Sequence, residues 1–582
     1  MSRAAVTNAG PANAEIARIF RDIAELLELS KANPFRIRAY RNAARVVEES
    51  PRSLAVMAHS APKAIRELPS IGEDLAGKIE EIVRTGTLPL LKQLEHKAPP
   101  GAVALMHVPG IGPRRAKVLS KRLGVRSLEG LTRAARAGRV HELKGFGRKT
   151  ESHFLEEIAA RTSTEKRLLR SRAAQYGEPF VTYMLAGPGV ERAELAGSFR
   201  RCRDTVGDLD MLVQAEDGRA AVRHFLAYPE VRRVTAHGTT RAAVRLAGGV
   251  AVDLRVVPPE SYGAALHYFT GSKAHNIAIR ALGRRAGLKI NEYGVYRGKR
   301  RIAGNEETDV FKAVGLPWIA PELREMRGEI EAARNGTLPS LVQLRHIRGD
   351  LQVHTTDSDG RASLDEMAEA AQSLGYQYIA VTDHTPAVRI AGGMSRDEFR
   401  KQMRRIDRLN AKLSRLTILK GAEVDVRTDG TLDLDDDTLA MFDIVLVSLH
   451  SSLGLSPAKQ TARITRALRH PRVHIFAHPH ARLINGRAGA RFDLDEVCRV
   501  AAGEGVLLEI NAQPERLDLD DIAAGRAQEL GASFVINTDA HSTEELGFMR
   551  WGVDQARRGW IERKRVANTR SLDELLALLR KR

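Results

Sequence analysis

The sequence predicts a multidomain chain of mixed class, with helical amino-terminal domains, an α+β middle and an α/β carboxyl-terminal domain. Three observations predict this. The amino-terminal part has apolar residues at helical spacing, interrupted by a recurring glycine turn. From about residue 180, short apolar runs alternate with loops, as strands do. From residue 349, such runs alternate with helices, which is the rhythm of a β/α barrel or a layered α/β domain. The 582 residues allow about three to five domains.

Charge and composition limit the possible functions. Residues 1–350 hold 58 basic and 38 acidic residues, whereas residues 351–582 hold 33 and 34. The excess of basic residues in 1–350 creates a positive field, which attracts polyanions. We therefore expect a nucleic-acid partner for residues 1–350. No apolar run reaches the ~18 residues of a membrane span, and no secretory signal is evident. The two cysteines, Cys202 and Cys498, exclude a disulfide framework and fit a cytoplasmic protein.

The amino-terminal region has predicted helices over residues 14–50, ended by Pro51, and then a pattern that occurs three times. The copies read PSIGEDLAGKI at 69–79, PGIGPRRAKVL at 109–119 and KGFGRKTESHF at 144–154. Each predicts a glycine turn followed by a helix start, whose N–H groups can hold a phosphate without reading a base. The pattern resembles the helix-hairpin-helix motif of DNA-repair proteins. That resemblance implies DNA contacts at Gly72, Gly110, Gly112, Gly145 and Gly147.

The middle of the chain has predicted strands at 209–213, 242–247 and 250–257, followed by helix over 261–290. Asp208 and Asp210 are two residues apart on a predicted strand, so both carboxylates face one side. A third carboxylate is expected on a neighbouring strand, and Asp253 in VAVDLRV fits. Such oxygen ligands suit Mg²⁺, and two Mg²⁺ ions can drive in-line phosphoryl transfer.

Upstream of the carboxylates, the string GSFRRCRDTVGDLD adds groups that bind a triphosphate. Gly197 and Ser198 can offer a backbone N–H and a hydroxyl. Arg200 and Arg201 offer positive charge, although only one of the two can face the pocket. The whole string is much more specific than an isolated pair of aspartates.

This string, with YFTGS at 268–272 and INEY at 290–293, closely resembles the family X DNA polymerases, over about residues 15–317. The resemblance implies two-metal nucleotidyl transfer at short DNA gaps, with Asp208, Asp210 and Asp253 as catalytic metal ligands. It further implies that Asp253 takes the proton of the primer 3′-hydroxyl or orients the oxygen of that hydroxyl. The implied nucleotide-binding residues are Gly197, Ser198, Arg201, Tyr268, Phe269, Gly271 and Asn276. Arg280 would contact the template, while Arg255, Glu292 and Tyr293 would change partners when the thumb closes.

The sequence departs from the family pattern at three positions. Cys202 replaces a usual glycine, Val206 a phosphate-binding serine and Lys273 an acidic residue beside the base. Triphosphate binding is therefore expected to be weaker or differently arranged, but the three carboxylates are present.

The region 1–88 resembles the family's lyase module, through RIRAYRNAA at 36–44 and IGEDLAGKIEEI at 71–82. Lys78 matches the catalytic lysine that forms a Schiff base with a 5′-deoxyribose phosphate. Such an amine needs a lowered pKa, and Asp74 stands one turn earlier where a lysine is usual. The alternative is that Lys78 contacts a phosphate.

The carboxyl-terminal part places histidines and carboxylates at the ends of predicted strands. Imidazole mixed with carboxylate suits Zn²⁺ or Mn²⁺, and strand ends of a barrel meet at one mouth. The candidate ligands are His354, Asp359, His384, Glu423, His450, His478, Asp539 and His541. The set resembles the PHP (polymerase and histidinol phosphatase) domain, which implies a distorted (β/α)7 barrel with two or three ions. Gln352 stands where that pattern opens with histidine, so one ion is weaker or absent, or the Gln352 oxygen substitutes.

Together these resemblances predict six segments. They are a lyase-like helix-hairpin-helix domain at 1–88, a second such domain at 89–175, a nucleotidyltransferase palm at 176–260, a thumb at 261–317, a linker at 318–348 and a PHP domain at 349–582.

The expected function is gap-filling DNA synthesis in repair, joined to a 3′–5′ exonuclease and to abasic-site or 3′-phosphate processing. Expected cofactors are Mg²⁺ at the polymerase site and Mn²⁺ or Zn²⁺ at the PHP site. Expected partners are gapped, nicked or 3′-end DNA and dNTPs, with DNA ligase or other repair proteins as further candidates, for a nucleoid-associated monomer. The alternatives are a nuclease whose polymerase half mainly binds DNA, a non-catalytic DNA-end binding scaffold, and a template-free nucleotidyltransferase.

Overall fold

The structure is a computed structural model. It describes residues 11, 13–30, 32–49, 54–60, 62–66, 68, 71–98, 101, 105–106, 108, 111–143, 145–148, 150–152, 154–155, 167–388, 391–487 and 489–580. Contacts divide the chain into two units. The first contains 1–168, 172–195 and 206–258, and the second contains 169–171, 196–205 and 259–582.

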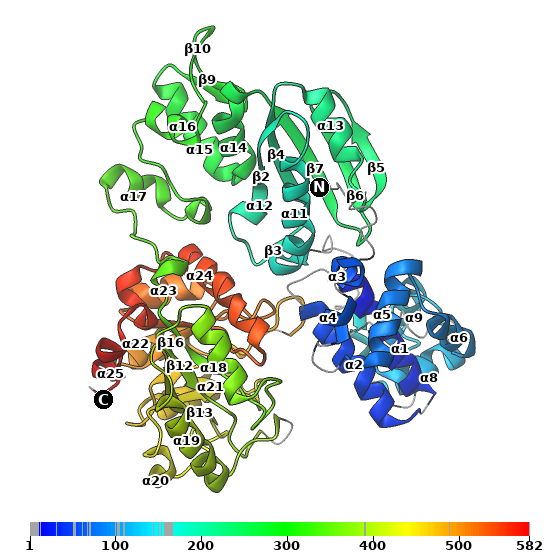
Figure 1. The fold of residues 1–582 in the computed structure, drawn as a ribbon, viewed down its shortest axis with the longest axis vertical. Coiled ribbons are helices and arrows are strands. Elements are labelled where there is room, and N and C mark those ends of the chain that lie inside the picture. Colours follow the sequence, from blue (N-terminus) through cyan, green and yellow to red (C-terminus); the bar gives the residue numbers. More distant parts are fainter. Residues whose placement is uncertain are drawn as a thin grey trace. The chain divides into compact units, whose positions relative to one another are not determined.

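The amino-terminal part of the first unit is helical, as the periodicity predicts (Figure 1). Its helices are α1 (Asn13–Leu29), α2 (Pro34–Glu49), α3 (Leu54–Ser60), α4 (Pro62–Arg66), α5 (Glu73–Thr85), α6 (Pro89–Lys97), α8 (Pro113–Leu123) and α9 (Leu128–Arg136). The expected helices over 14–50 correspond to α1 and α2, while Pro51 lies outside the described residues. One apolar cluster joins α1 to α6, where Phe20 packs edge-on against Tyr40, and a separate cluster surrounds α8 and α9.

The segment expected to form the palm contains a mixed five-stranded sheet in the order β2-β4-β7-β6-β5. Its strands are β2 (Val190–Leu195), β4 (Leu209–Ala215), β5 (Val231–His237), β6 (Arg241–Leu246) and β7 (Ala251–Val257). Only β4 and β7 pair in parallel. The three strands expected from sequence are confirmed. The boundary expected at 175/176 instead falls inside α11 (Arg170–Leu185), where Phe180 stacks on Phe225 of α13 (Gly218–Leu226).

The thumb begins the main part of the second unit. It contains α14 (Tyr262–Thr270), α15 (Lys273–Arg285), α16 (Glu307–Ala313) and the small sheet β8 (Lys289–Asn291), β9 (Gly294–Arg297), β10 (Arg300–Ala303). The short helix α12 (Gly197–Arg200) belongs to this unit as well, because loop 196–205 contacts the thumb and the barrel.

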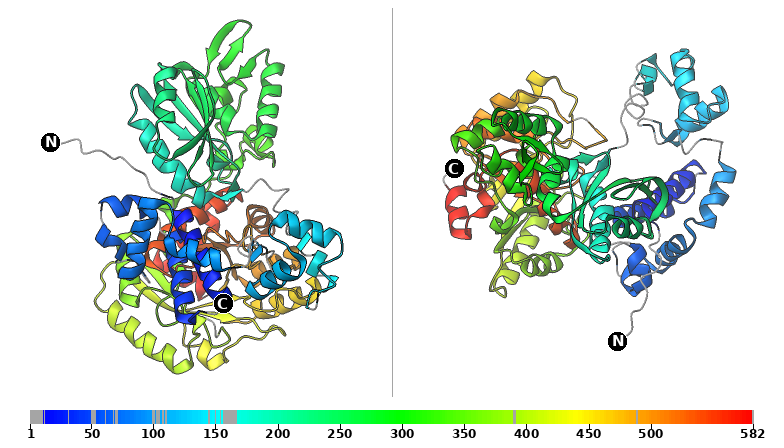
Figure 2. Two further views of the ribbon diagram at one scale, coloured as in Figure 1. Left: turned by 90° about the vertical axis from the view of Figure 1, so that its right-hand side faces the viewer. Right: turned by 90° about the horizontal axis from the view of Figure 1, so that it is seen from above.

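Residues 318–348, expected to be a linker, are packed rather than extended. They contain α17 (Glu329–Asn335) and short 3₁₀ turns, and Arg324 and Glu329 are completely buried. Apolar residues at helical spacing in α17 join the thumb core, and Glu322 and Arg327 pair with barrel residues. This segment and the orange-to-red end of the barrel therefore lie side by side (Figure 1 and Figure 2).

The carboxyl-terminal domain is a nearly closed barrel of parallel strands, as predicted. The strands follow chain order and are β11 (Gly349–Val353), β12 (Tyr378–Val381), β13 (Thr417–Asp425), β14 (Ile444–Ser448), β15 (Ile475–Phe476), β16 (Leu507–Asn511) and β17 (Phe534–Asn537). A single bridge from Val353 to Ala540 links the two edge strands. The surrounding helices are α18 (Leu364–Ser373), α19 (Arg396–Asn410), α20 (Asp436–Leu439), α21 (Pro457–Leu468), α22 (Leu494–Glu504), α23 (Asp521–Glu529) and α24 (Met549–Arg558).

Helix α25 (Leu572–Leu579) closes the amino-terminal end of the barrel. Its Leu575 and Leu579 pack on Leu351, Tyr378 and other interior residues. The opposite end, where the strands finish, is therefore left for polar side chains. Among the described residues, no helix is long and apolar enough to cross a membrane.

Candidate active sites and DNA-contacting turns

The first candidate site lies on the two parallel strands of the palm. Asp210 on β4 is directly opposite Asp253 on β7, and Asp208 immediately precedes β4. Leu209 between the two aspartates is fully buried, so both carboxylates point to the other side, as the spacing predicts. Burial raises the pKa of Asp253, and the negative charge of Asp208 raises it further. Clustered carboxylates that repel one another fit divalent cations, because cation binding relieves the repulsion.

Loop 196–205 is held by the thumb most closely through two of its arginines, Arg200 and Arg201. Arg200 donates to Glu307 at 2.6 and 3.0 Å and to the Thr270 hydroxyl at 2.8 Å. Arg201 donates to the Thr270 carbonyl at 2.5 Å and to Glu325 at 3.1 Å. A triphosphate reaching Arg201 would therefore share or replace the Glu325 carboxylate.

The thumb residues expected to meet the nucleotide lie next to Arg201. Gly271 has a φ of +72°, and a Cβ there would stand 3.1 Å from the Arg201 guanidinium, so this position requires glycine. Tyr268 and Phe269 pack edge-on at 5.2 Å. The Asn276 amide donates to the Tyr268 carbonyl at 2.7 Å, while its buried oxygen has no hydrogen-bond partner among the described residues. Arg280 is exposed on α15.

Three turns of the amino-terminal domains share one hydrogen-bonding pattern. The residue before each second glycine is buried and donates its N–H to the residue three earlier. These bonds run from Ile71 to Leu68, from Ile111 to Val108 and from Phe146 to Leu143, at 3.0, 2.9 and 2.9 Å. The repeated sequence pattern therefore corresponds to a repeated structure.

The second glycines of these turns have no steric role within the described structure. Gly72 and Gly112 cap α5 and α8 with φ of −75° and −77°, which any residue adopts. A Cβ on Gly72, Gly112 or Gly147 would meet no described atom within 4 Å. The absence of a side chain instead leaves the helix-start N–H groups open to a close external approach. Gly145 has a φ of +93°, and Gly110 lies outside the described residues.

Lys78 on α5 forms an ion pair with Asp74, one turn earlier. Its ammonium also lies 5.9 Å from the centre of the Tyr40 ring. Both contacts engage the amine within the domain, whereas Schiff-base formation needs a free nucleophilic amine.

The second candidate site lies at the carboxyl-terminal ends of the barrel strands, where Glu423 occupies the centre. It is fully buried and lies 3.0–3.6 Å from ring nitrogens of four histidines. They are His354, His384, His450 and His478. Burial alone would raise the pKa of Glu423, but the imidazoles of His384 and His450 hold it well below its usual range.

Two further carboxylates extend the cluster. Asp539 lies 3.1 Å from His354, and Asp359 lies 3.3 Å from His541 and 3.6 Å from His384. The structure therefore brings all eight predicted ligands together. Nδ1 of His384 and Nδ1 of His478 are buried with no hydrogen-bond partner among the described residues. A dense set of imidazole and carboxylate groups with unsatisfied nitrogens fits transition-metal cations.

Gln352 occupies a position within this cluster. Its amide nitrogen donates to Glu423 at 3.0 Å and to Asp539 at 3.3 Å, and its buried oxygen has no partner among the described residues. The amide nitrogen thus provides hydrogen bonds to two of the carboxylates. The Gln352 oxygen is still available to a cation.

Several supporting groups were not predicted from sequence. Asp425 accepts the His450 backbone N–H at 3.1 Å and lies 3.3 Å from its ring, and Asn511 donates to Asp539 at 3.1 Å. Asp425 follows Glu423 by two residues on β13, which could have indicated its orientation. Near the ligands, Asp383 orders the loop that carries Asp359 by bonding Thr355 and Ser358, while His480 pairs with Asp518.

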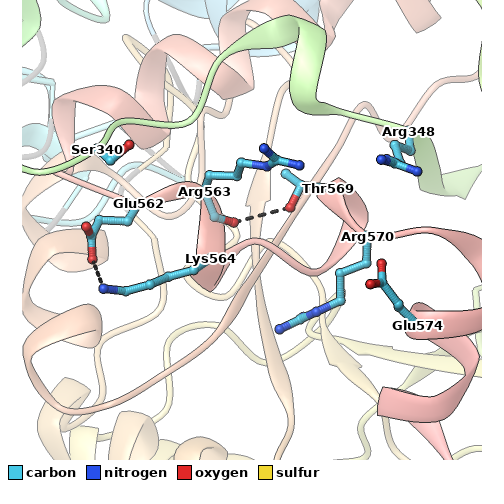
Figure 3. A pocket seen from close by; sticks show the side chains of 8 residues that line it. All are labelled: Ser340, Arg348, Glu562, Arg563, Lys564, Thr569, Arg570 and Glu574. Atoms are coloured by element: carbon cyan, nitrogen blue, oxygen red, sulfur yellow. Dashed lines mark hydrogen bonds and ion pairs between the residues drawn. The ribbon is translucent and has the colours of Figure 1, made fainter.

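A basic pocket of about 520 Å³ lies at the other end of the barrel (Figure 3). Arg348 in its lining precedes β11, whereas His354 follows that strand. This pocket is therefore separate from the metal-binding cluster, although it is well formed.

Comparison with known proteins matches most of these regions. Residues 11–88 match a helix-hairpin-helix domain, 103–159 a SAM-like helix-hairpin-helix tandem, 265–325 the DNA polymerase beta thumb and 350–513 the PHP domain.

Whole-protein relatives give the same result. The chain is 38% identical to "DNA polymerase/3'-5' exonuclease PolX" of Bacillus subtilis over 97% of this chain and 99% of that protein. It is 27% identical to DNA polymerase lambda of Rattus norvegicus over 44% of this chain and 48% of that protein. A "Probable phosphatase" of Syntrophotalea carbinolica is 26% identical over 40% of this chain and 95% of its own length. The chain therefore belongs to the family X DNA polymerases that carry a carboxyl-terminal PHP domain.

Proposed function

We propose that this protein is a template-directed DNA polymerase that fills short gaps during repair, with a 3′–5′ exonuclease in its barrel. The observation that carries the polymerase proposal is the pairing of Asp210 with Asp253 beside Asp208. These carboxylates would hold Mg²⁺, which supplies charge stabilisation at the transferred phosphoryl group. Asp253 would accept the proton of the primer 3′-hydroxyl or orient the oxygen of that hydroxyl.

The nucleotide would be held by loop 196–205 and the thumb. Gly197, Ser198 and Arg201 would bind the triphosphate, and Tyr268, Phe269 and Gly271 would pack against the sugar. Asn276 would reach the minor-groove edge of the nascent pair. The unpartnered oxygen of Asn276 supports a role as an acceptor there.

The barrel would bind Mn²⁺ or Zn²⁺ through the eight residues around Glu423, and the ions supply activated water for phosphodiester cleavage. The chemistry of the donors supports these ions rather than Ca²⁺, because five of the eight ligands are imidazoles. Arg516 lies 4.0 Å from Asp539 and is partly exposed, so it is placed to attract a phosphate of the DNA end.

DNA would be held by the glycine turns, together with Arg255 and Arg280. The open helix starts at Gly72 and Gly112 support backbone contacts that do not depend on sequence. Lys78 would act as the lyase nucleophile only if its pairing with Asp74 were broken, so we propose a phosphate contact as its alternative role.

One gapped substrate tests the two activities separately. Incubation with Mg²⁺ and dNTPs should extend the primer, and Asp210→Asn should abolish extension while leaving 3′–5′ trimming in Mn²⁺. The double variant His450→Ala with Asp539→Ala should show the converse. Asp217→Asn in the palm and His470→Ala in the barrel are matched controls. Asp217 caps α13 and His470 pairs with Asp436, both away from the two sites.

Extension that survives Asp210→Asn would overturn the polymerase proposal. Trimming that survives the double variant would overturn the exonuclease proposal. Trimming without any extension by the unmodified protein would instead favour a nuclease whose polymerase half only binds DNA.

A further inference from the structure

Loop 196–205 makes hydrogen bonds and ion pairs with the barrel as well as with the thumb. All of these residues belong to one compact unit, which contains 169–171, 196–205 and 259–582. The barrel residues involved come from α24 and from the segment that follows His478 (Figure 1). None of them belongs to the set of metal ligands proposed above.

Arg558, the last residue of α24, contacts the loop most directly. One of its guanidinium nitrogens donates to the Arg201 carbonyl at 2.6 Å and to Glu325 at 3.2 Å. Glu325 also accepts from the Arg201 side chain at 3.1 Å. Arg558 is 2% exposed, and its other nitrogen is anchored by Asp521 at 2.5 Å. One buried barrel arginine thus holds both the backbone and, through Glu325, the side chain of Arg201.

A second barrel arginine holds the end of the loop. Arg482 donates to the Asp204 carboxylate at 2.9 Å. The same side chain is fixed by the carbonyls of Arg516 and Leu517, at 2.8 and 2.5 Å. Asp208, the first of the polymerase carboxylates, follows Asp204 by only four residues in sequence. The barrel therefore constrains the chain shortly before it enters β4.

The third contact involves the residue that starts α11. Arg170 forms an ion pair with Asp554 of α24 and lies 4.6 Å from the Trp551 ring. Its backbone N–H donates to the Asp204 carbonyl at 2.9 Å. Arg170 is also 5.9 Å from the ring of Phe199, inside the loop. Barrel residues thus support the loop directly at Arg201 and Asp204, and through Arg170 at Phe199.

We propose that Arg558 and Arg482 of the barrel are positioning residues of the polymerase, which hold loop 196–205 in the conformation that binds the incoming triphosphate. This inference rests on the proposed polymerase function and adds that the PHP barrel is part of the nucleotide site's support. Buried, charge-assisted hydrogen bonds fix geometry more firmly than neutral ones, and a phosphate site loses affinity when its donors move. The effect should therefore fall on nucleotide binding.

The test uses the full chain and single-nucleotide gap filling under single-turnover conditions, as a function of dNTP concentration. Asp204→Ala and Arg482→Met should each raise the apparent Kd for dNTP by about 5- to 20-fold, the range expected for one charged hydrogen bond. The maximal rate should change less. Because Asp204 and Arg482 act through one bond, the double variant should be no worse than the more affected single variant.

Rescue and control variants separate positioning from general damage. Arg482→Lys retains a donor and should recover part of the dNTP affinity. Arg526→Met removes a barrel arginine that pairs with Asp495 and Glu529, and should leave dNTP affinity unchanged. Asp204→Ala alters the loop rather than the barrel, so its effect does not depend on whether the Arg482 variant folds normally.

The outcomes are distinguishable. Unchanged dNTP affinity in Asp204→Ala and Arg482→Met, in a protein that fills gaps normally, overturns this inference and leaves the proposed polymerase function standing. Equal losses in the Arg526→Met control also overturn it. No gap filling by the unmodified protein overturns the proposed function and this inference together.

Discussion

Asp210 and Asp253 lie directly opposite each other on neighbouring parallel strands. This register comes from a five-stranded sheet in which β4 and β7 form the only parallel pair. A shift by one residue would turn one of the two carboxylates to the opposite face of the sheet. The site therefore depends on strand register as much as on the identity of its residues.

Removing one charge from this pair should separate catalysis from DNA binding. Asp253→Asn should reduce primer extension by about a thousandfold or more, because a metal ligand and a proton acceptor are lost together. Affinity for gapped DNA should be retained or increased, since a negative charge near the DNA is removed. Extension assays and fluorescence anisotropy measure the two effects. Asp253→Asn protein that extends primers at the normal rate would contradict the assignment.

Restoring the missing imidazole should change the metal content of the barrel. Gln352 donates to Glu423 and Asp539, so its amide competes for carboxylates that would otherwise bind a cation. Gln352→His should increase the Mn²⁺ or Zn²⁺ bound per chain and lower the Mn²⁺ concentration needed for trimming. Elemental analysis of the purified protein provides the measurement. Equal metal content in the two proteins would show that Gln352 already serves as a ligand or that the position is irrelevant.

The hairpin glycines should affect DNA binding but not stability. Gly72→Ser and Gly112→Ser place a favourable N-cap residue at positions with ordinary φ and open space, so the free energy of unfolding should stay the same or rise. DNA affinity of the double variant should fall by about tenfold, because a side chain now stands where a phosphate approaches.

The matched control for these turns is Gly124, which ends α8 with a φ of +65°. Gly124→Ser should cost about 1 kcal/mol of stability, because a side chain is strained in that conformation. Its DNA affinity should not change. Undiminished DNA binding by the Gly72 and Gly112 double variant would argue that these turns face another partner.

The lysine of the lyase-like domain offers a direct chemical test. Asp74→Lys removes the ion pair that holds the Lys78 side chain and restores the lysine that is usual at this position, which should free the Lys78 amine for reaction. Borohydride trapping on a 5′-deoxyribose phosphate substrate should increase in this variant and disappear in Lys78→Ala. Trapping that persists in Lys78→Ala would assign the reaction to another amine.

The thumb should be sensitive to acid through Glu307. Burial would raise the pKa of Glu307, but the guanidinium groups of Arg324 and Arg200 lower it far below its usual 4.5. A lowered folded pKa contributes stability above pH 4.5, and that contribution is lost as the pH falls toward the folded value. The free energy of unfolding should therefore drop more steeply between pH 5 and pH 3 than in Glu307→Gln, which is expected to be ~3–5 kcal/mol less stable at neutral pH. Denaturant titration measures the free energy of unfolding of both proteins at each pH. If the two proteins lose stability in parallel as the pH falls, Glu307 is not the source of the acid sensitivity.

Much of the fold and of the chemistry follows from local sequence. Short apolar runs separated by loops or helices predicted the strands of the palm and barrel. A strand that is buried on one or both faces needs apolar residues, whichever strand it pairs with. The ligand positions were also predictable: Asp208 and Asp210 flank a buried leucine, and the eight barrel ligands stand at strand ends. What was missed around them, such as Asp425 and Asn511, resembles ordinary strand residues until the structure shows what they contact.

The sequence by itself determined which residues carry charge, which segments become strands and helices, and which motifs repeat, since these depend on spacing along a few turns or strand residues. Only the tertiary structure decided that residues 318–348 are packed rather than a free linker. Only it brought Arg482 and Arg558 of the barrel to Asp204 and Arg201, which lie more than 270 residues away in sequence. The physical reason is that such long-range ion pairs and hydrogen bonds are set by how whole domains pack. No local pattern of residues records which distant surface will supply the partner.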